Sequence, residues 1–293
     1  MQNGLKKNLN FYLFSNQNYF TYNLFNKIYS LLKLNKKIKN QLINKYQANG
    51  FVKSRQVKSE DLAEIKIILQ NSKKIKKKNL IEYEINDELR LKIKKLFIQY
   101  FLDDIKNFEN YFSSNIFVTH VKISTNIGFK TNNEDKVQYY SENYHTDNYI
   151  FTYFKLFVNL EDVGDDKGPL HFVPTNNQKK FIKLSNYKNR YLYDENNIDH
   201  LIYKNVGKEG DSIFVNTTEN LHKAGIPDIG KSRTVIRFEL NAIPSNKSKN
   251  DLFNYENKEK NIYNDEYWSK IYAKPKGILN TILLLVNFLK EIR

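Results

Sequence analysis

The sequence predicts an α+β fold, in which helices accompany a double-sheet jelly roll. Residues 1–115 carry apolar side chains at helical spacing, whereas residues 116–243 contain short segments rich in β-branched and aromatic residues. Gly, Pro, Asn and Asp interrupt those segments, which favours a jelly roll built from short strands. A chain of 293 residues with 40% hydrophobic content can also bury one sizeable core.

The first part of the chain contains two clear predicted helices. Ser59 is predicted as the N-cap of a helix that runs to about Asn71, because two acidic residues follow it in the first turn. A longer helix is predicted over residues 86–108, whose apolar residues form one face. Between the two helices, residues 73–78 are a charge run that we interpret as a solvated loop, with phosphate binding as the alternative.

Five segments of the second part are predicted as strands. They cover residues 116–123, 152–160, 170–173, 212–215 and 234–240. Each is enriched in the residue types that favour a sheet. In a jelly roll such strands surround a small site in the mouth of the barrel, where side chains from different strands converge.

The most informative stretch runs from Tyr144 to Leu240. His145 and Asp147 stand two positions apart, so their side chains point to the same side of an extended strand. His222 lies 75 residues beyond Asp147, so only tertiary folding can bring it to them. Two imidazoles and one carboxylate fill one face of an octahedral metal and leave the opposite face open, a ligand set that suits non-haem Fe(II).

A permanently charged residue follows the second histidine. Arg233 lies eleven residues after His222, and its planar guanidinium is the side chain best matched to a carboxylate. The four residues together therefore predict a site for ferrous iron and a dicarboxylate co-substrate. Arg237 shares the strand face of Arg233 and is the alternative partner for that carboxylate. Lys122, on an early strand, is a further candidate contact.

These motifs resemble the phytanoyl-CoA dioxygenase family of Fe(II)/2-oxoglutarate oxygenases. The resemblance rests on His145-Thr146-Asp147, the acidic turn before Gly168-Pro169-Leu170, Gly210-Asp211, His222 and Arg233, with a weaker match over residues 46–62. It spans residues 43–243. It implies a cupin-like double-stranded β-helix with N-terminal helices packed on one sheet and a C-terminal helix.

The resemblance also implies a chemistry. His145, Asp147 and His222 would bind Fe(II) as the catalytic centre, and Arg233 and Lys122 would bind 2-oxoglutarate as the co-substrate. The implied reaction is hydroxylation of a small-molecule or conjugated metabolite, with release of succinate and CO2. A catalytically inactive jelly roll that binds a small anionic ligand is the alternative.

The chain departs from the family pattern after Pro174. A Gly-Ser-His sequence is usual there, but residues 175–177 are Thr-Asn-Asn. This difference affects the local turn and leaves the four site residues in place. The presence of Asp147 argues against a halogenase, because related halogenases have a small residue at that position.

The chain is predicted to divide into three parts. Residues 1–42 would form an N-terminal helical extension, residues 43–245 the oxygenase domain with its helices over 59–108 and its β core over 116–243, and residues 246–293 a C-terminal helical extension. We expect a helix after Gly277 that seals the core or mediates dimerisation, with peripheral membrane contact as the alternative. Its apolar run is well short of a bilayer span.

Composition limits the classes of function. The chain has no Cys, which excludes disulfides, thiolate ligands and iron-sulfur clusters and fits a cytoplasmic location. The formal net charge of +15 comes mainly from Lys scattered along the whole chain, which we interpret as codon bias rather than a nucleic-acid surface. With no signal-peptide pattern visible, we expect a cytoplasmic protein with a small-molecule substrate and no nucleic-acid partner. The oligomeric state stays open.

Overall fold

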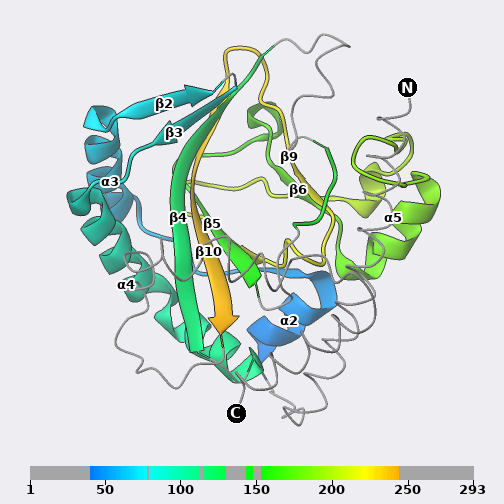
Figure 1. Ribbon diagram of the computed structural model, residues 1–293, viewed down its shortest axis with the longest axis horizontal. Helices are drawn as coiled ribbons and strands as arrows, with labels where there is room; N and C mark the ends of the chain where they lie inside the picture. Colours follow the sequence, from blue (N-terminus) through cyan, green and yellow to red (C-terminus); the bar gives the residue numbers. More distant parts are fainter. Residues whose placement is uncertain (1–39, 78, 113–114, 130–142, 148–152, 244–293) are drawn as a thin grey trace, which may run out of the picture.

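The computed structural model describes residues 40–77, 79–112, 115–129, 143–147 and 153–243 (Figure 1). These residues form an α+β unit with two β-sheets, and helices lie on both sides of it. The predicted C-terminal extension, and all but the last residues of the N-terminal one, lie outside the described residues. Both extensions therefore stay predictions.

The larger sheet is antiparallel and has the strand order β1-β8-β5-β10-β4-β3-β2. Its strands are β1 (Phe51–Lys53), β2 (Lys74–Lys77), β3 (Leu80–Tyr83), β4 (Asn115–Ile127), β5 (Tyr153–Asn159), β8 (Ser212–Val215) and β10 (Ser232–Ile243). The smaller sheet has the order β7-β6-β9. Its strands are β6 (Leu170–Phe172), β7 (Tyr203–Lys204) and β9 (His222–Ala224).

From β4 onward the chain passes several times between the two sheets. β4, β5, β8 and β10 belong to the larger sheet, whereas β6, β7 and β9 form the smaller one. Between β4 and β5, His145 joins the smaller sheet through an isolated bridge to His222. Two facing sheets whose strands interleave in this way form a double-stranded β-helix. The predicted jelly roll is thus confirmed.

The larger sheet is covered on both faces. On its outer face, Ile236, Phe238 and Leu240 of β10 join a core cluster with residues of the helices. On its inner face, which points to the smaller sheet, Val235 packs in a second cluster that includes Phe172 of β6. Because strand side chains alternate between faces, a single strand contributes to both layers.

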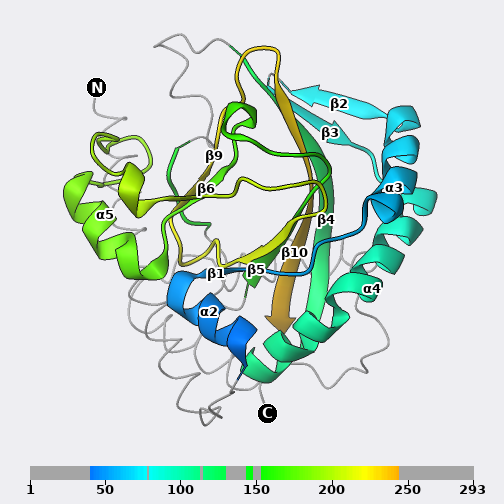
Figure 2. The same cartoon turned by 180° about the vertical axis from the view of Figure 1, so that it is seen from behind.

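Helices α2 (Gln41–Asn49), α3 (Ser59–Asn71) and α4 (Asp87–Phe112) pack into the core cluster of the outer face. Figure 2 shows α3 and α4 on one side of the molecule and α5 (Gln178–Leu184) on the opposite side. Phe181 of α5 packs with Tyr144, Val173 and Leu221, so this helix supports the segment around the smaller sheet. None of the helices in the described part of the chain is both long enough and apolar enough to cross a bilayer.

The predicted helices are present with differences at their ends. Lys58, rather than Ser59, occupies the N-cap position of α3, and no side chain caps this end. The N-cap prediction was therefore wrong, and Ser59 belongs to the first turn. Helix α4 continues beyond Phe108 to Phe112, because the added turn still buries Phe112 against the sheet.

The interpretation of residues 73–78 as a solvated loop was wrong. Residues 74–77 form β2, which pairs with β3 in antiparallel register from Lys74 opposite Tyr83 to Lys77 opposite Leu80. β2 lies at the edge of the larger sheet, where lysine side chains are common because they keep other strands from pairing. Charge alone therefore did not indicate a loop.

Candidate metal centre

Two histidines from distant parts of the sequence pair through their backbones. The His145 N–H donates to the His222 carbonyl at 3.0 Å, and the His222 N–H donates to the His145 carbonyl at 2.9 Å. Residues that exchange both bonds stand directly opposite each other and present their side chains on the same face. The two imidazole centroids are accordingly 4.4 Å apart.

Asp147 lies beside both histidines. Its backbone N–H donates to the Thr217 carbonyl at 2.8 Å, which fixes this segment against the connection between β8 and β9. Its Oδ1 is 3.9 Å from His145 Nε2 and its Oδ2 is 3.9 Å from His222 Nε2. One ligand atom from each residue lies within 4.8 Å of the others, a spacing that a single metal ion can bridge. We call these three residues the His-Asp-His triad.

Each histidine of the triad is held in one tautomer. His145 Nδ1 is 2.7 Å from the Asn143 carbonyl oxygen, and His222 Nδ1 is 3.0 Å from the Asn220 carbonyl oxygen. A carbonyl only accepts, so each Nδ1 must carry the proton and each Nε2 keeps a lone pair. This is the arrangement that a metal-binding imidazole requires. Any residue has a carbonyl, so the sequence held no signal for these two supports.

The protonation states of the triad also suit a metal. Burial lowers the pKa of His145 to about 3, and the nearby His222 adds to the effect. Burial is likewise the main cause of the lowered pKa of His222. For Asp147, burial opposes ionisation, but the charge and hydrogen bond of Lys155, together with His222 and Thr217, outweigh the burial and hold the pKa below the usual range. At neutral pH the triad therefore offers two neutral imidazoles and one carboxylate.

Lys155 is a site residue that the sequence motifs did not indicate. It lies on β5, where all seven residues are buried, and its side chain donates from Nζ to Asp147 Oδ2 at 2.5 Å. A signal did exist in the sequence, because lysine is rarely buried without a charged partner. A lysine in the middle of the predicted strand 152–160 is such a signal, although it does not identify which carboxylate is the partner.

Arg233 is almost fully buried, with 2% of its surface exposed. It lies two residues before Val235 on β10 and so shares the inner face of the sheet. Among the described residues, its Nε and Nη1 have no hydrogen-bond partner. Burial lowers its pKa to about 10, which still leaves the guanidinium charged at neutral pH. Open donors on a buried cation are costly, and they indicate a position for an anion.

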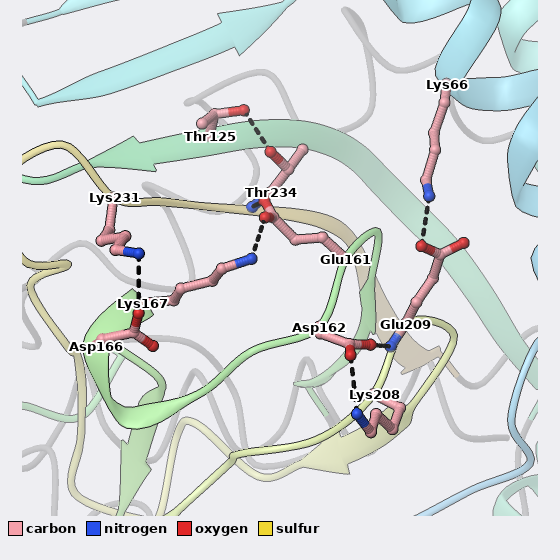
Figure 3. Close-up of polar contacts among 10 residues, drawn as sticks. All are labelled: Lys66, Thr125, Glu161, Asp162, Asp166, Lys167, Lys208, Glu209, Lys231 and Thr234. Atoms are coloured by element: carbon pink, nitrogen blue, oxygen red, sulfur yellow. Dashed lines mark hydrogen bonds and ion pairs between the residues drawn. The ribbon is translucent and has the colours of Figure 1, made fainter.

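The acidic turn after β5 holds the start of β10 in place (Figure 3). Glu161 accepts the Thr234 backbone N–H at 2.8 Å and the Lys167 ammonium at 2.7 Å. Thr234 also shares a 2.7 Å hydroxyl hydrogen bond with Thr125 of β4. These contacts fix the backbone next to Arg233, so the acidic turn positions the guanidinium indirectly.

Gly168 lets the acidic turn pass close to a second segment. Its φ is +60°, a conformation that favours glycine, and a Cβ there would lie 2.4 Å from the carbonyl carbon of Ile226. Asp228 N–H donates to the Asp166 carbonyl at 2.8 Å in the same region. The Gly of the Gly-Pro-Leu motif is therefore required by the close approach of the two backbones.

The other two cations singled out in the sequence are placed differently. Arg237 shares the inner face, but its Nη2 already donates to Glu239 Oε1 at 2.9 Å. Lys122 stands opposite Arg237 in the pairing of β4 with β10. It lines a pocket that it shares with His120 and to which neither the triad nor Arg233 contributes. The structure thus brings the triad together, places Arg233 on the inner face, and associates Lys122 with a different pocket.

The segment that departs from the family pattern supports the triad. Thr175 begins a short 3-10 turn, and its hydroxyl accepts from Asn220 Nδ2 at 3.1 Å. The same amide donates to the Val173 carbonyl at 3.0 Å. Because the Asn220 carbonyl accepts from His222, this turn is linked to the orientation of a triad imidazole.

No protein-family model matches the sequence, and no curated protein matches it. Similar solved structures include the non-heme alpha-ketoglutarate-dependent epimerase SnoN from nogalamycin biosynthesis, with TM-score 0.47, 14% identity, and coverage of 70% of this chain and 82% of that chain. HygX from Streptomyces hygroscopicus, with nickel and 2-oxoglutarate bound, has TM-score 0.47, 10% identity, and coverage of 70% and 87%. EctD from S. alaskensis, with 2-oxoglutarate and 5-hydroxyectoine, has TM-score 0.48, 13% identity, and coverage of 72% and 78%.

Because the TM-scores are below 0.5 and the identities are 14% or lower, these similarities do not assign a function to the chain. The fold and the site define its class on their own: a double-stranded β-helix protein that carries a triad of two histidines and one carboxylate.

Proposed function

We propose that the protein is an Fe(II)/2-oxoglutarate-dependent oxygenase. The observation that carries the proposal is the buried triad of His145, Asp147 and His222, in which both Nε2 atoms keep a lone pair. Two imidazoles and one carboxylate on one side of a metal leave positions open for a co-substrate and dioxygen. The sequence motifs around the triad support the same class.

The donor set fits ferrous iron. The triad offers two nitrogen donors and one oxygen donor, and the chain has no Cys that would provide a soft thiolate ligand. His145, Asp147 and His222 would hold the ion, which when bound would supply the activation of dioxygen and the oxidative decarboxylation of 2-oxoglutarate. The contribution of the protein is to ligate the metal, orient the reactants and exclude water.

Arg233 is the proposed anchor for the far carboxylate of 2-oxoglutarate. Its buried guanidinium has two open nitrogen donors, whereas Arg237 is already bonded to Glu239. A planar guanidinium pairs with a carboxylate through two parallel hydrogen bonds, which provides both energy and orientation. Lys122 remains a second candidate contact, with weaker support because it lines another pocket.

The proposed reaction is hydroxylation of a small-molecule or conjugated metabolite, with release of succinate and CO2. The test is anaerobic reconstitution with Fe(II), followed by addition of 2-oxoglutarate and oxygen and measurement of succinate. We expect about one iron per chain and succinate release that His145→Ala abolishes. An inactive binding protein would bind the anion but release no succinate, and that outcome would replace the oxygenase proposal.

The role of Arg233 has a separate test. Arg233→Ala should weaken 2-oxoglutarate binding while leaving iron binding intact, because the guanidinium is not a metal ligand. Arg237→Ala is the matched comparison on the same strand face. Normal co-substrate affinity in the Arg233 variant, together with weakened affinity in the Arg237 variant, would transfer the role to Arg237.

A further inference from the structure

We propose that Lys155 is a positioning residue that holds one carboxylate oxygen of Asp147 and sets the charge of the metal site. It thereby weakens binding of the metal ion and strengthens binding of the anionic co-substrate. This inference rests on the proposed function, since it concerns the same site.

The backbone of Lys155 is fixed between two strands. In β5 it stands opposite Glu239 of β10 on one side and Val215 of β8 on the other. Its side chain is 9% exposed, so the ammonium cannot move into solvent without breaking the packing of the inner face. The ammonium is therefore a permanent part of the site.

Lys155 makes the two carboxylate oxygens of Asp147 different from each other. Nζ donates to Oδ2 at 2.5 Å, and this oxygen is also 3.9 Å from His222 Nε2, whereas Oδ1 is 3.9 Å from His145 Nε2. A carboxylate oxygen that already accepts from an ammonium is a weaker metal donor. Lys155 thus favours ligation through Oδ1 and orients the plane of the carboxylate, as outer partners of metal ligands commonly do.

A second carboxylate lies near Lys155 but is already paired. Glu239 is opposite Lys155 in the strand register, and its Oε1 accepts from Arg237 at 2.9 Å. The inner face therefore carries alternating charges, in the order Asp147, Lys155, Glu239 and Arg237. Since Arg237 balances Glu239, the lysine charge acts mainly on Asp147.

This pairing changes the charge that a metal and a co-substrate experience. The triad alone would carry one negative charge, but together with the lysine it is neutral. A divalent cation then binds against the repulsion of a nearby ammonium, while a dianion such as 2-oxoglutarate gains attraction. Without the lysine, Asp147 would also be a buried charge with no counter-ion until metal binds. Both effects predict tighter metal binding when the lysine charge is removed.

The experiment uses the full chain and Co(II) as a redox-stable probe. Affinities for Co(II) alone, and then for 2-oxoglutarate with the Co(II)-loaded protein, are measured by calorimetry for the wild type, Lys155→Met and Lys155→Gln. We expect Co(II) affinity to rise by about tenfold in both variants and 2-oxoglutarate affinity to fall by about tenfold. The Gln side chain has no charge but can still donate to Asp147, so this variant separates the effect of the charge from the effect of the hydrogen bond. It also keeps the test possible if the Met variant does not fold.

Lys66→Met is the matched control. Lys66 also forms a 2.5 Å ion pair, with Glu209, but it lies on α3, outside the triad (Figure 3). Its removal should leave both affinities unchanged. Unchanged or lower Co(II) affinity in the two Lys155 variants would overturn the inference while leaving the proposed function intact. A wild-type protein that binds no Co(II) would instead overturn the proposed function, and the inference with it.

Discussion

The two faces of the larger sheet use the same strands for different purposes. On the outer face, β10 contributes Ile236, Phe238 and Leu240 to an apolar core. On the inner face, the same strand contributes Arg233 and Arg237, and these alternate with the apolar residues. One strand thus belongs to a stabilising apolar layer and to a layer that carries charged side chains.

The difference between the faces is energetic as well as chemical. Apolar residues of the outer face gain free energy from leaving water, and they need no partner. Buried charges of the inner face cost free energy unless each is paired, and Arg233 keeps two open donors. The outer face therefore maintains the fold and allows the inner face to keep groups that are costly on their own.

The largest expected effect is a loss of stability caused by a substitution on the outer face. Phe97 of α4 is fully buried, with its ring centroid 4.9 Å from that of Phe238. Phe97→Ala should lower the free energy of unfolding by about 3–5 kcal/mol, because it leaves a cavity between α4 and the sheet. Urea denaturation measures this loss. Metal affinity under folding conditions should stay the same, and a parallel loss of affinity would show that the two faces are not independent.

The next effect is on the triad. His145→Ala should reduce metal affinity by more than about 100-fold, because one of three donors is removed, yet it should destabilise the fold less than Phe97→Ala does. Calorimetric titration with Co(II) and urea denaturation check the two parts. His200→Ala changes an exposed histidine and is the control for metal affinity. Retained binding in the His145 variant would remove this residue from the ligand set.

Arg233→Met is expected to improve stability at the expense of function. The apolar side chain fills a similar volume and leaves no open buried donor, so the free energy of unfolding should rise by about 1–2 kcal/mol. Arg237→Met should do the opposite, because it leaves the largely buried carboxylate of Glu239 without its ion-pair partner. Thermal denaturation of the two variants compares them directly. A loss of stability in Arg233→Met would indicate that the guanidinium is satisfied in the folded protein.

The smallest expected effect is a change in stability with pH, caused by His171 on the smaller sheet. Burial, helped by Lys223, lowers its pKa from 6.5 to about 4. Between these values the unfolded chain binds a proton that the folded chain does not, so stability should fall as the pH drops from 6.5 toward 4. The residue is partly exposed, so the loss should be less than about 1 kcal/mol. His171→Asn should show a shallower pH dependence in urea denaturation, and an unchanged one would contradict the assignment.

Much of the fold could be predicted because its strands carry a clear local signal. The segments 170–173 and 212–215 correspond closely to β6 and β8. The strands β7 and β9 were not predicted, because they have two and three residues and form only by pairing with β6. The segment of β2 was predicted as a loop, because lysine is common both in loops and in edge strands.

The candidate site was predictable where side-chain identity carries the chemistry. The motif spacing indicated His145, Asp147 and His222, and the structure brings them together. It could not indicate the carbonyl groups that fix the imidazoles, because every residue has one. Lys155 was missed because its partner is eight positions away and lies on a separate segment, so only the folded chain shows the ion pair.

The carbonyl supports of the two imidazoles have a consequence for how metal is taken up. Because each Nδ1 donates to a carbonyl and burial disfavours protonation of each ring, neither histidine has a proton to give up from Nε2 at neutral pH. Asp147 is already ionised. Metal loading should therefore release almost no protons, and the heat of titration should be the same in buffers of different ionisation enthalpy.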